Sequence, residues 1–308
     1  MPASERAIHL WGVRIASSLV LVALALLLTP ARARACPTCS VGDPTLTTMG
    51  AEAPYKNRVR LSLGASTRGD RLGRPQFDEI RLREQRLDLT AAWSATERLV
   101  LSFNLPLSHR HFAYADLSRE QIVTLGDAEL RARIILFRDR RFSPNHLLSM
   151  IAALEMPTAP RIDRHGQRLP LEVQPGTGSW DPTIGLGYDL FKNPFSLHTI
   201  ATLKISTPGF EGSLAGPSAR LLATFQWQAH PRFGLRAGID SRIDGVTRES
   251  YGEVANSGGF IAFATAGFVA SMTRRALIHA FVYIPTLNFL RGEHREGVAA
   301  SLGFTYDI

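Results

Sequence analysis

The chain has 308 residues, of which 45% are hydrophobic and 20% are charged, and its formal net charge is +8. Lys and Arg form no cluster along the chain, so the positive charge does not indicate nucleic-acid binding. The composition fits an ordinary globular protein and an outer-membrane barrel equally well. The order of the residues must therefore distinguish the two.

Residues 1–35 have the features of a cleaved secretory signal peptide. Arg6 and Arg14 come before an apolar run over residues 15–28, and Ala33 and Ala35 place small residues where a signal peptidase reads. We expect export beyond the inner membrane, which leaves 273 residues with a net charge of +5. No later stretch approaches the about 20 apolar residues of a membrane-spanning helix without a charge.

Residues 36–56 form a lead-in that contains both cysteines, Cys36 and Cys39. In an oxidising compartment we expect a local disulfide between them. The alternative is a soft metal bound at the periplasmic mouth, although a structural zinc site would need two more ligands. Lipidation of Cys36 is disfavoured because Ala33 and Arg34 fit the lipoprotein pattern poorly. Residues 36–52 are also the segment that could contact a periplasmic partner.

Residues 57–308 alternate apolar and polar side chains in twelve segments, which is the period of a β-strand. The clearest examples are residues 99–107 and 235–240, whereas residues 260–269 are apolar on both faces and leave their register open. The expected strands cover residues 57–67, 80–94, 98–110, 125–138, 146–157, 181–192, 196–207, 217–229, 233–243, 258–271, 275–286 and 297–308.

The connections between these segments alternate between short turns and long polar loops. This asymmetry is typical of an even-numbered outer-membrane barrel with both termini in the periplasm, and a soluble sandwich has no reason to impose it. The long loops are expected near residues 68–79, 111–124, 158–180, 208–216, 244–257 and 287–296. An interfacial girdle would explain an aromatic residue near the short-turn end of six strands: Trp93, Phe137, Phe191, Trp227, Phe268 and Tyr306.

The last eight residues, 301–308, alternate up to the carboxyl terminus, with Leu302, Phe304 and Tyr306 on one face. This pattern resembles the carboxy-terminal signal of the outer-membrane barrels of Gram-negative bacteria, which usually ends in Phe where this chain has Ile308. The resemblance implies a final strand that closes the barrel and a chain handled by the barrel-assembly machinery.

Three motifs in the middle of the chain carry a second resemblance. They are GDAELRARIILF from Gly126, LEMPTAP from Leu154 and GTGSWDPTIGLGYDL from Gly176. Over about residues 85–230 they resemble, in this order, the motifs of the outer-membrane transporters named for the meta-pathway of phenol degradation. The resemblance implies a channel or transporter for small hydrophobic or aromatic compounds. The start of the mature chain, from Cys36, departs from that pattern.

If the apolar face of each strand meets lipid, the opposite face supplies the lining of a lumen. Charges facing lipid would cost about 2–4 kcal/mol each at the midplane, which fixes this phase. The expected lining residues are Arg60, Arg86, Asp88, Glu129, Arg131, Arg133, Glu155, Asp189, Lys204, Arg236, Asp240, Arg242 and His279, with Arg58, Asn104, His198, Thr202 and Gln226. These charges could neutralise each other and plug the barrel, or they could form a polar path with an Arg-rich wall.

The third long loop, residues 159–179, could fold inward as a constriction, but we favour a solvated loop. Its charged side chains are Arg161, Asp163, Arg164, His165 and Arg168. Long loops are often functional, yet the outer loops of barrels are long in any case.

We find no residues that would make this barrel an enzyme. His109 and His111 lie near Ser108 at a strand end, but adjacent residues of a strand alternate faces and give no activating geometry. We expect no cofactor.

Taken together, these patterns predict an all-β, transmembrane antiparallel β-barrel of twelve strands in the outer membrane. Its expected work is passive or facilitated passage of small solutes, and its partners would be outer-membrane lipid and the solute. The alternative is a non-conducting barrel that scaffolds periplasmic proteins.

Overall fold

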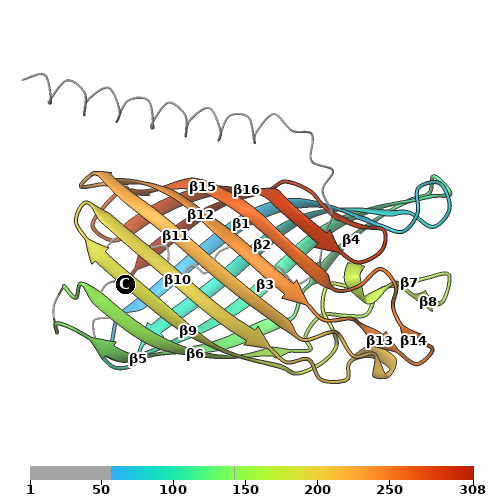
Figure 1. Cartoon of the computed structure of the whole chain (residues 1–308), viewed down its shortest axis with the longest axis horizontal. Coiled ribbons are helices and arrows are strands. Elements are labelled where there is room, and N and C mark those ends of the chain that lie inside the picture. The colour runs from blue at the N-terminus through green and yellow to red at the C-terminus, as the bar shows by residue number, and fades with distance from the viewer. Residues whose placement is uncertain (1–56, 142) are drawn as a thin grey trace, which may run out of the picture. The chain divides into compact units, whose positions relative to one another are not determined.

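The computed structural model describes residues 57–141 and 143–308, in which twelve long strands close into an antiparallel barrel (Figure 1). The closure joins β1 (Val59–Leu72) to β2 (Ile80–Ser94) on one side and to β18 (Ala299–Asp307) on the other, so no wall strand has a free edge. The other wall strands are β3 (Leu99–Tyr114), β5 (Ala128–Arg138), β6 (His146–Met156), β9 (Asp181–Lys192), β10 (Phe195–Lys204), β11 (Ser218–His230), β12 (Phe233–Asp244), β15 (Gly259–Ser271) and β16 (Ala276–Leu290). The predicted fold class is confirmed.

Two short strands extend the wall at one end. The strand β4 (Arg119–Leu125) pairs with the second half of β3, and β5 pairs with the first half. The expected loop at 111–124 is therefore mostly a hairpin, and the strand expected at 125–138 begins after a break at residues 126 and 127. The strand β17 (His294–Glu296) pairs with the end of β1 ahead of β18.

Short turns lie at one end of the barrel and long loops at the other, and we call these the turn end and the loop end. In Figure 1 the carboxyl terminus lies towards the turn end, on the left. Side chains close several short turns: Oγ1 of Thr96 accepts the amides of Arg98 and Leu99, and Oδ1 of Asp139 accepts those of Asn145 and His146. The expected alternation of connections is thus present.

The strands place apolar side chains outside and polar side chains inside. On β11, Leu221, Phe225 and Trp227 are exposed, whereas Thr224 and Gln226 between them are buried. The other strands share this phase, and the large exposed apolar residues include Leu61, Leu63, Leu89, Phe103, Leu130, Ile184, Leu186, Ile239, Val282, Leu302 and Phe304. This arrangement is the reverse of a soluble fold and is that of a barrel in a bilayer.

Five of the six aromatic residues expected in the girdle lie on the outer face of the wall. Trp93, Phe137, Trp227 and Tyr306 are exposed, and Phe268 stacks on the outward Phe233. The sixth, Phe191, shares the inward face of Asp189, and its ring meets that of His198 at 5.5 Å between centroids. The outward aromatic residue of this strand is Tyr188, which is hydrogen-bonded to His146.

The expected signal peptide and the lead-in with Cys36 and Cys39 lie outside the described residues. Within residues 57–141 and 143–308, no helix has the combination of length and apolar character that crossing a membrane requires.

Candidate functional site

All thirteen ionisable residues that the sequence predicts for the lumen lie on the inward face of the wall. Each falls at the inward phase of its strand, opposite to the exposed apolar positions. They are Arg60 on β1, Arg86 and Asp88 on β2, Glu129, Arg131 and Arg133 on β5, Glu155 on β6, Asp189 on β9, Lys204 on β10, Arg236, Asp240 and Arg242 on β12, and His279 on β16. The period of two is a local property, so the sequence could place them.

Opposite charges pair along this inner wall. Near the turn end, Nε of Arg60 lies 2.7 Å from Oδ1 of Asp307. Asp189 accepts from Arg133, and its other oxygen lies 2.9 Å from Nδ1 of His198. The other pairs are Arg86–Asp88 at 2.8 Å, Arg131–Glu129 at 2.9 Å, Lys204–Glu155 at 3.0 Å, Arg242–Glu296 at 2.7 Å and Arg220–Asp240. Most charges of the lumen are therefore satisfied by the wall itself.

Arg236 is an exception within the described part of the chain. Its Nε donates to Oε1 of Gln226 at 2.6 Å, and its guanidinium lies 5.9 Å from the ring centre of Phe281. Nη2 has no hydrogen-bond partner, and no carboxylate of the described residues pairs with it. The ring of His279, another predicted lumen residue, covers Gly303, where a Cβ would lie 2.3 Å from the ring. The guanidinium of Arg236 therefore places a positive charge at this level of the lumen without a matching acid.

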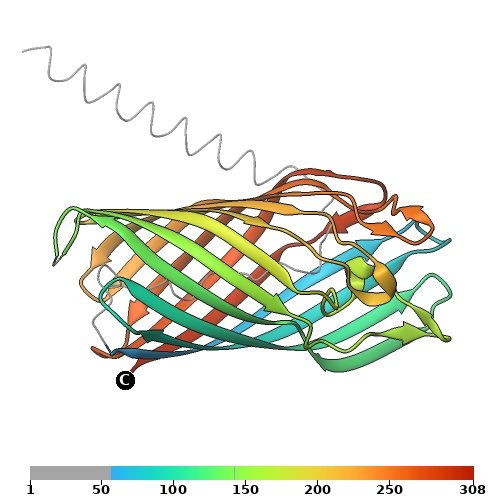
Figure 2. The ribbon, with the colours of Figure 1, turned by 90° about the horizontal axis from the view of Figure 1, so that it is seen from below.

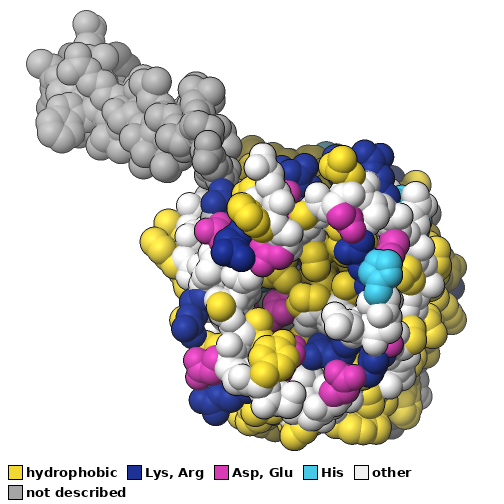
Figure 3. Space-filling view, turned by 90° about the vertical axis from the view of Figure 1, so that its right-hand side faces the viewer, with side chains coloured by type: hydrophobic (Ala, Val, Ile, Leu, Met, Phe, Trp, Pro, Cys, Tyr) yellow, Lys and Arg dark blue, Asp and Glu magenta, His cyan; other side chains and the backbone are white. Residues whose placement is uncertain are grey.

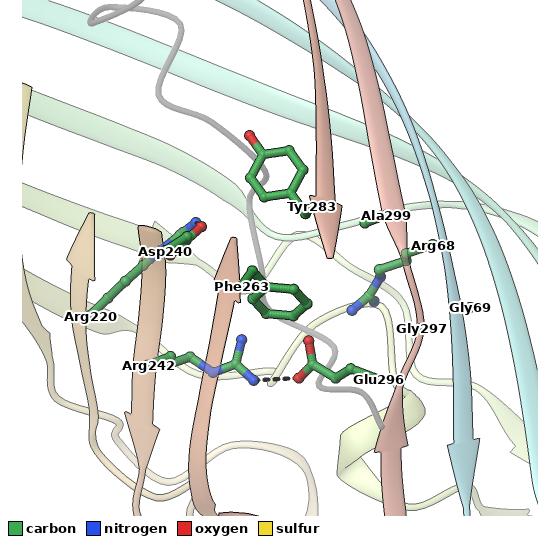
Figure 4. Close-up of a pocket in the computed structure, with 10 residues that line it drawn as sticks. All are labelled: Arg68, Gly69, Arg220, Asp240, Arg242, Phe263, Tyr283, Glu296, Gly297 and Ala299. Atoms are coloured by element: carbon green, nitrogen blue, oxygen red, sulfur yellow. Dashed lines mark hydrogen bonds and ion pairs between the residues drawn. The ribbon is translucent and has the colours of Figure 1, made fainter. Parts of the chain in front are cut away.

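An aromatic strip runs up the inner wall beside these charges. Ile261, Phe263, Phe281 and Tyr283 form a buried cluster on the inward faces of β15 and β16. Figure 4 shows Phe263 and Tyr283 in a pocket with the pair Arg242–Glu296 and the pair Arg220–Asp240. The sequence did not reveal this strip, because residues 260–269 are apolar on both faces and the register there depends on pairing with β12 and β16.

Residues 169–179 of the loop at 157–180 are mostly buried at the loop end of the lumen, so the prediction of a solvated loop is wrong for this half, whereas most of residues 160–167 are exposed. Its short helix η1 (Leu171–Val173) lies within the walls at this end in both views (Figures 1 and 2). Ile162, Leu169 and Val173 pack with inward-facing residues of β1, β2 and β3, among them Leu82 and Phe112. The apolar residues at 169, 171 and 173 were the available signal, since a solvated loop has no need of them.

The three motifs of the family resemblance meet at the point where this loop joins the wall. Asp127 accepts the amides of Ala159 and Thr177 at 2.9 and 2.8 Å. Oγ1 of Thr158 accepts the amide of Ala128 and donates to the carbonyl of Gly126. A Cβ at Gly176 would lie 2.1 Å from Oδ2 of Asp127, so this position requires glycine. The motifs therefore hold the inward loop in place.

Ion pairs tie the same loop to its neighbours. Arg164 donates to Asp116 at 2.6 Å, and its guanidinium lies 3.6 Å from the ring centre of Tyr114. Hydrogen bonds from Ser118, together with Arg164, lower the pKa of Asp116 to about 2. The remaining ties are Arg168–Glu249 at 2.6 Å, Arg168–Glu211 at 3.3 Å, and contacts from Arg161 to Glu211 and Asp163. Of the five expected charged residues, His165 sits at the hairpin tip between β7 (Asp163–Arg164) and β8 (Gln167–Arg168).

The inward part of this loop lines a cavity at the loop end of the barrel. Its lining includes Leu171, Glu172, Lys204, Asp244, Thr247 and Leu290. Glu172 is 6% exposed, and neither carboxylate oxygen pairs with a cation among the described residues. Burial raises the pKa of Glu172 to about 7, although its own backbone amide and the Thr247 hydroxyl favour the charged form. Viewed from this end, charged side chains surround a central hollow (Figure 3).

The described residues hold no group of His, Cys, Asp and Glu arranged to bind a metal ion. Ser108 and Arg110 are buried on the inward face of β3. His109 and His111 lie on the opposite face of the strand, with their ring centres 4.2 Å apart. Ser108 and the two histidines do not converge into a catalytic arrangement.

The sequence matches no protein-family model and no curated protein. The fold is similar to the crystal structure of an outer membrane channel from Pseudomonas putida F1, with a TM-score of 0.66 and 13% identity over 87% of this chain and 100% of that one. The transport unit of the autotransporter AIDA-I from Escherichia coli gives 0.48 and 8% over 88% and 94% of the two chains. The Pseudomonas putida toluene transporter TodX gives 0.46 and 11% over 90% and 96%. At such identities the likeness to the first channel establishes the fold and does not identify a solute.

Proposed function

We propose that the protein is an outer-membrane channel for passive or facilitated passage of small solutes. The observation that carries this is the inner wall, where polar and charged residues from all parts of the barrel face inward while the outer face is apolar. Many paired charges offer hydrogen bonds that are individually weak, which lets a solute bind and leave again. The fold shared with a solved outer membrane channel supports the proposal.

We propose further that the turn end faces the periplasm and the loop end faces outward. Barrels of this class have short periplasmic turns and longer outer loops. Residues 1–35 would act as the cleaved export signal, residues 36–56 would form the periplasmic lead-in, and the barrel-assembly machinery would insert residues 57–308.

The finer proposal is that the solutes include hydrophobic or aromatic compounds. Phe263, Phe281 and Tyr283 supply an aromatic strip inside the lumen, next to guanidinium groups. Aromatic faces bind apolar and aromatic solutes, and the neighbouring charges orient a polar substituent. The resemblance to the transporters named for phenol degradation points to the same class.

The test is a liposome-swelling panel with sugars, amino acids, phosphate and aromatic acids. Purified refolded barrel should let at least one class enter, and heat-denatured protein in the same liposomes should let none enter. Phe281→Ala should change the rate for aromatic solutes more than the rate for sugars. Liposomes that exclude every solute despite a correctly folded barrel would contradict the channel and favour the non-conducting scaffold.

A further inference from the structure

The cavity lined by η1 lies in a part of the mouth where acidic groups exceed basic ones. Glu172, Asp244, Lys204 and His294 line it, and Asp244 shares the guanidinium of Arg242 with Glu296. Nζ of Lys204 is shared between Glu155 at 3.0 Å and Asp181 at 3.5 Å. The charge of Lys204 is thus already matched by carboxylates of the wall. The local excess of acids contrasts with the positive net charge of the whole chain.

Glu172 is the group in this cavity that most needs a partner. Its side chain is more than nine-tenths buried, and neither carboxylate oxygen pairs with a cation among the described residues; the hydroxyl of Thr247 is its neutral neighbour. Arg168, the nearest guanidinium of the same loop, is bound by Glu249 at 2.6 Å and Glu211 at 3.3 Å. A buried carboxylate without a hydrogen-bonded cation is costly, so a site of this kind favours a ligand that supplies one.

The rest of the lining indicates which chemical groups that cation would carry. Thr247 brings a hydroxyl group, which accepts a hydrogen bond from a donor with several protons, whereas the hydroxyl of Ser257 already accepts the amide of Thr247 and donates to the carbonyl of Val254. Leu171 and Leu290 bring apolar surface to the same cavity. A bare metal ion would need more carboxylates than the described residues gather here. An ammonium group has three donors, and a hydrocarbon or aromatic body attached to it would cover the leucines.

We propose that this cavity binds a small organic ammonium ion, with its charged nitrogen on Glu172 and its apolar body against Leu171 and Leu290. The proposal rests on the channel function, because it names a solute class for the same mouth. Loop 157–180 would form one wall of the site, and the solute would enter it before the charged lumen.

The binding test needs no transport. Isothermal titration of benzylammonium into the full barrel in detergent would be compared with benzyl alcohol and benzoate, which keep the ring and change the charge. We expect benzylammonium to bind at least tenfold more tightly than either. Glu172→Gln should remove this preference, and Glu253→Gln, an exposed acid of the neighbouring loop, should keep it.

Binding should also depend on pH, since the carboxyl must release its proton to pair with the ammonium. The charged groups near Glu172 are Arg168 and Glu249 from the loops, Lys204 and Asp244 from β10 and β12, and His294 from β17. Affinity for benzylammonium should rise between pH 6 and pH 8 in the unaltered protein and stay flat in Glu172→Gln.

The outcomes separate this site from the channel. Tight benzylammonium binding with liposomes that exclude every solute would leave the site standing and overturn the channel. Solute entry with equal affinity for the three ring compounds, or with unchanged binding in Glu172→Gln, would overturn the site. The variant is close to isosteric and removes a buried charge, and its folding is checked by the mobility of unheated and heated samples on SDS gels.

Discussion

Asp127 connects the inward loop to the barrel wall through two backbone amides from opposite ends of the loop. Hydrogen bonds to a charged acceptor contribute about 1.5–3 kcal/mol each. Gly126 and Thr158 position this carboxylate, and Gly176 leaves room for it. The motifs that carry the family resemblance thus have a structural role that the sequence alone did not give them.

Replacing Asp127 with Ala should release the loop from the wall while the barrel stays closed. Both amides would lose their acceptor, so the packed loop should be destabilised by about 3 kcal/mol or more. Trypsin should then cut after Arg161, Arg164 or Arg168 at least tenfold faster. Asp139→Ala removes a carboxylate that also accepts two amides, but at the turn end, and should leave these sites protected. Equal protection in both variants would contradict the anchor.

Glu172 should make the packing of the loop sensitive to pH. The pKa is about 7 in the folded protein and 4.5 for an ordinary Glu, so the packed state holds the proton more tightly than the open state. The packed loop is therefore fully stabilised below about pH 4.5 and loses stability as the pH rises through 7, by about 3 kcal/mol at most.

Hydrogen exchange of residues 159–179, corrected for the intrinsic rate at each pH, measures this. The ratio of exchange in the unaltered protein to exchange in Glu172→Gln should increase between pH 5 and pH 8. A constant ratio would mean that the carboxyl titrates in the same way in the packed and open loop.

At the scale of the strand, the two faces of the wall meet different solvents. Leu221 and Leu222 are consecutive leucines on β11. Leu221 lies on the outer face and is 48% exposed. Leu222 faces inward, where it packs beside Ile151 and Ile200 and pairs in register with Asp240. The same substitution at these two positions therefore compares the cost of a side chain that faces lipid hydrocarbon with the cost of one that faces the lumen.

Leu221→Lys should cost about 2–4 kcal/mol in a bilayer, the cost of a Lys facing lipid at mid-depth. Leu222→Lys should cost less, because the inward ammonium would face the polar lumen near the pair Arg220–Asp240 and not hydrocarbon. Urea titration of both variants in liposomes gives the two free energies of unfolding. A larger cost for Leu222→Lys than for Leu221→Lys would contradict the assignment of lipid to the outer face.

The strands could be predicted from the sequence and the inward loop could not, for one physical reason. A strand with one apolar face shows its period within ten residues, so the face of Arg60 or Asp240 is readable locally. The loop is packed by residues far apart in the chain: Leu169 lies in one hydrophobic cluster with Phe112, and Arg168 pairs with Glu249. The same holds for the aromatic strip, whose register is set by its neighbours on β12 and β16.

At the scale of the whole molecule, the barrel joins an apolar exterior, a charge-paired interior and one mouth narrowed by a packed loop. The exterior fixes the environment as a bilayer. The interior supplies many weak polar contacts, which suits passage more than tight storage. The loop end would select among solutes, because the carboxylate of Glu172 there is not matched by a cation of the wall.

The central claim is that water lies inside the wall and lipid outside it. Spin labels placed singly at residues 218–227 of β11, with Cys36 and Cys39 replaced by Ser and the barrel in liposomes, test it most directly. Labels at 218, 220, 222, 224 and 226 should collide with a water-soluble nickel chelate, and labels at 219, 221, 223, 225 and 227 should collide with oxygen dissolved in lipid. The opposite phase, or no period of two, would contradict the account.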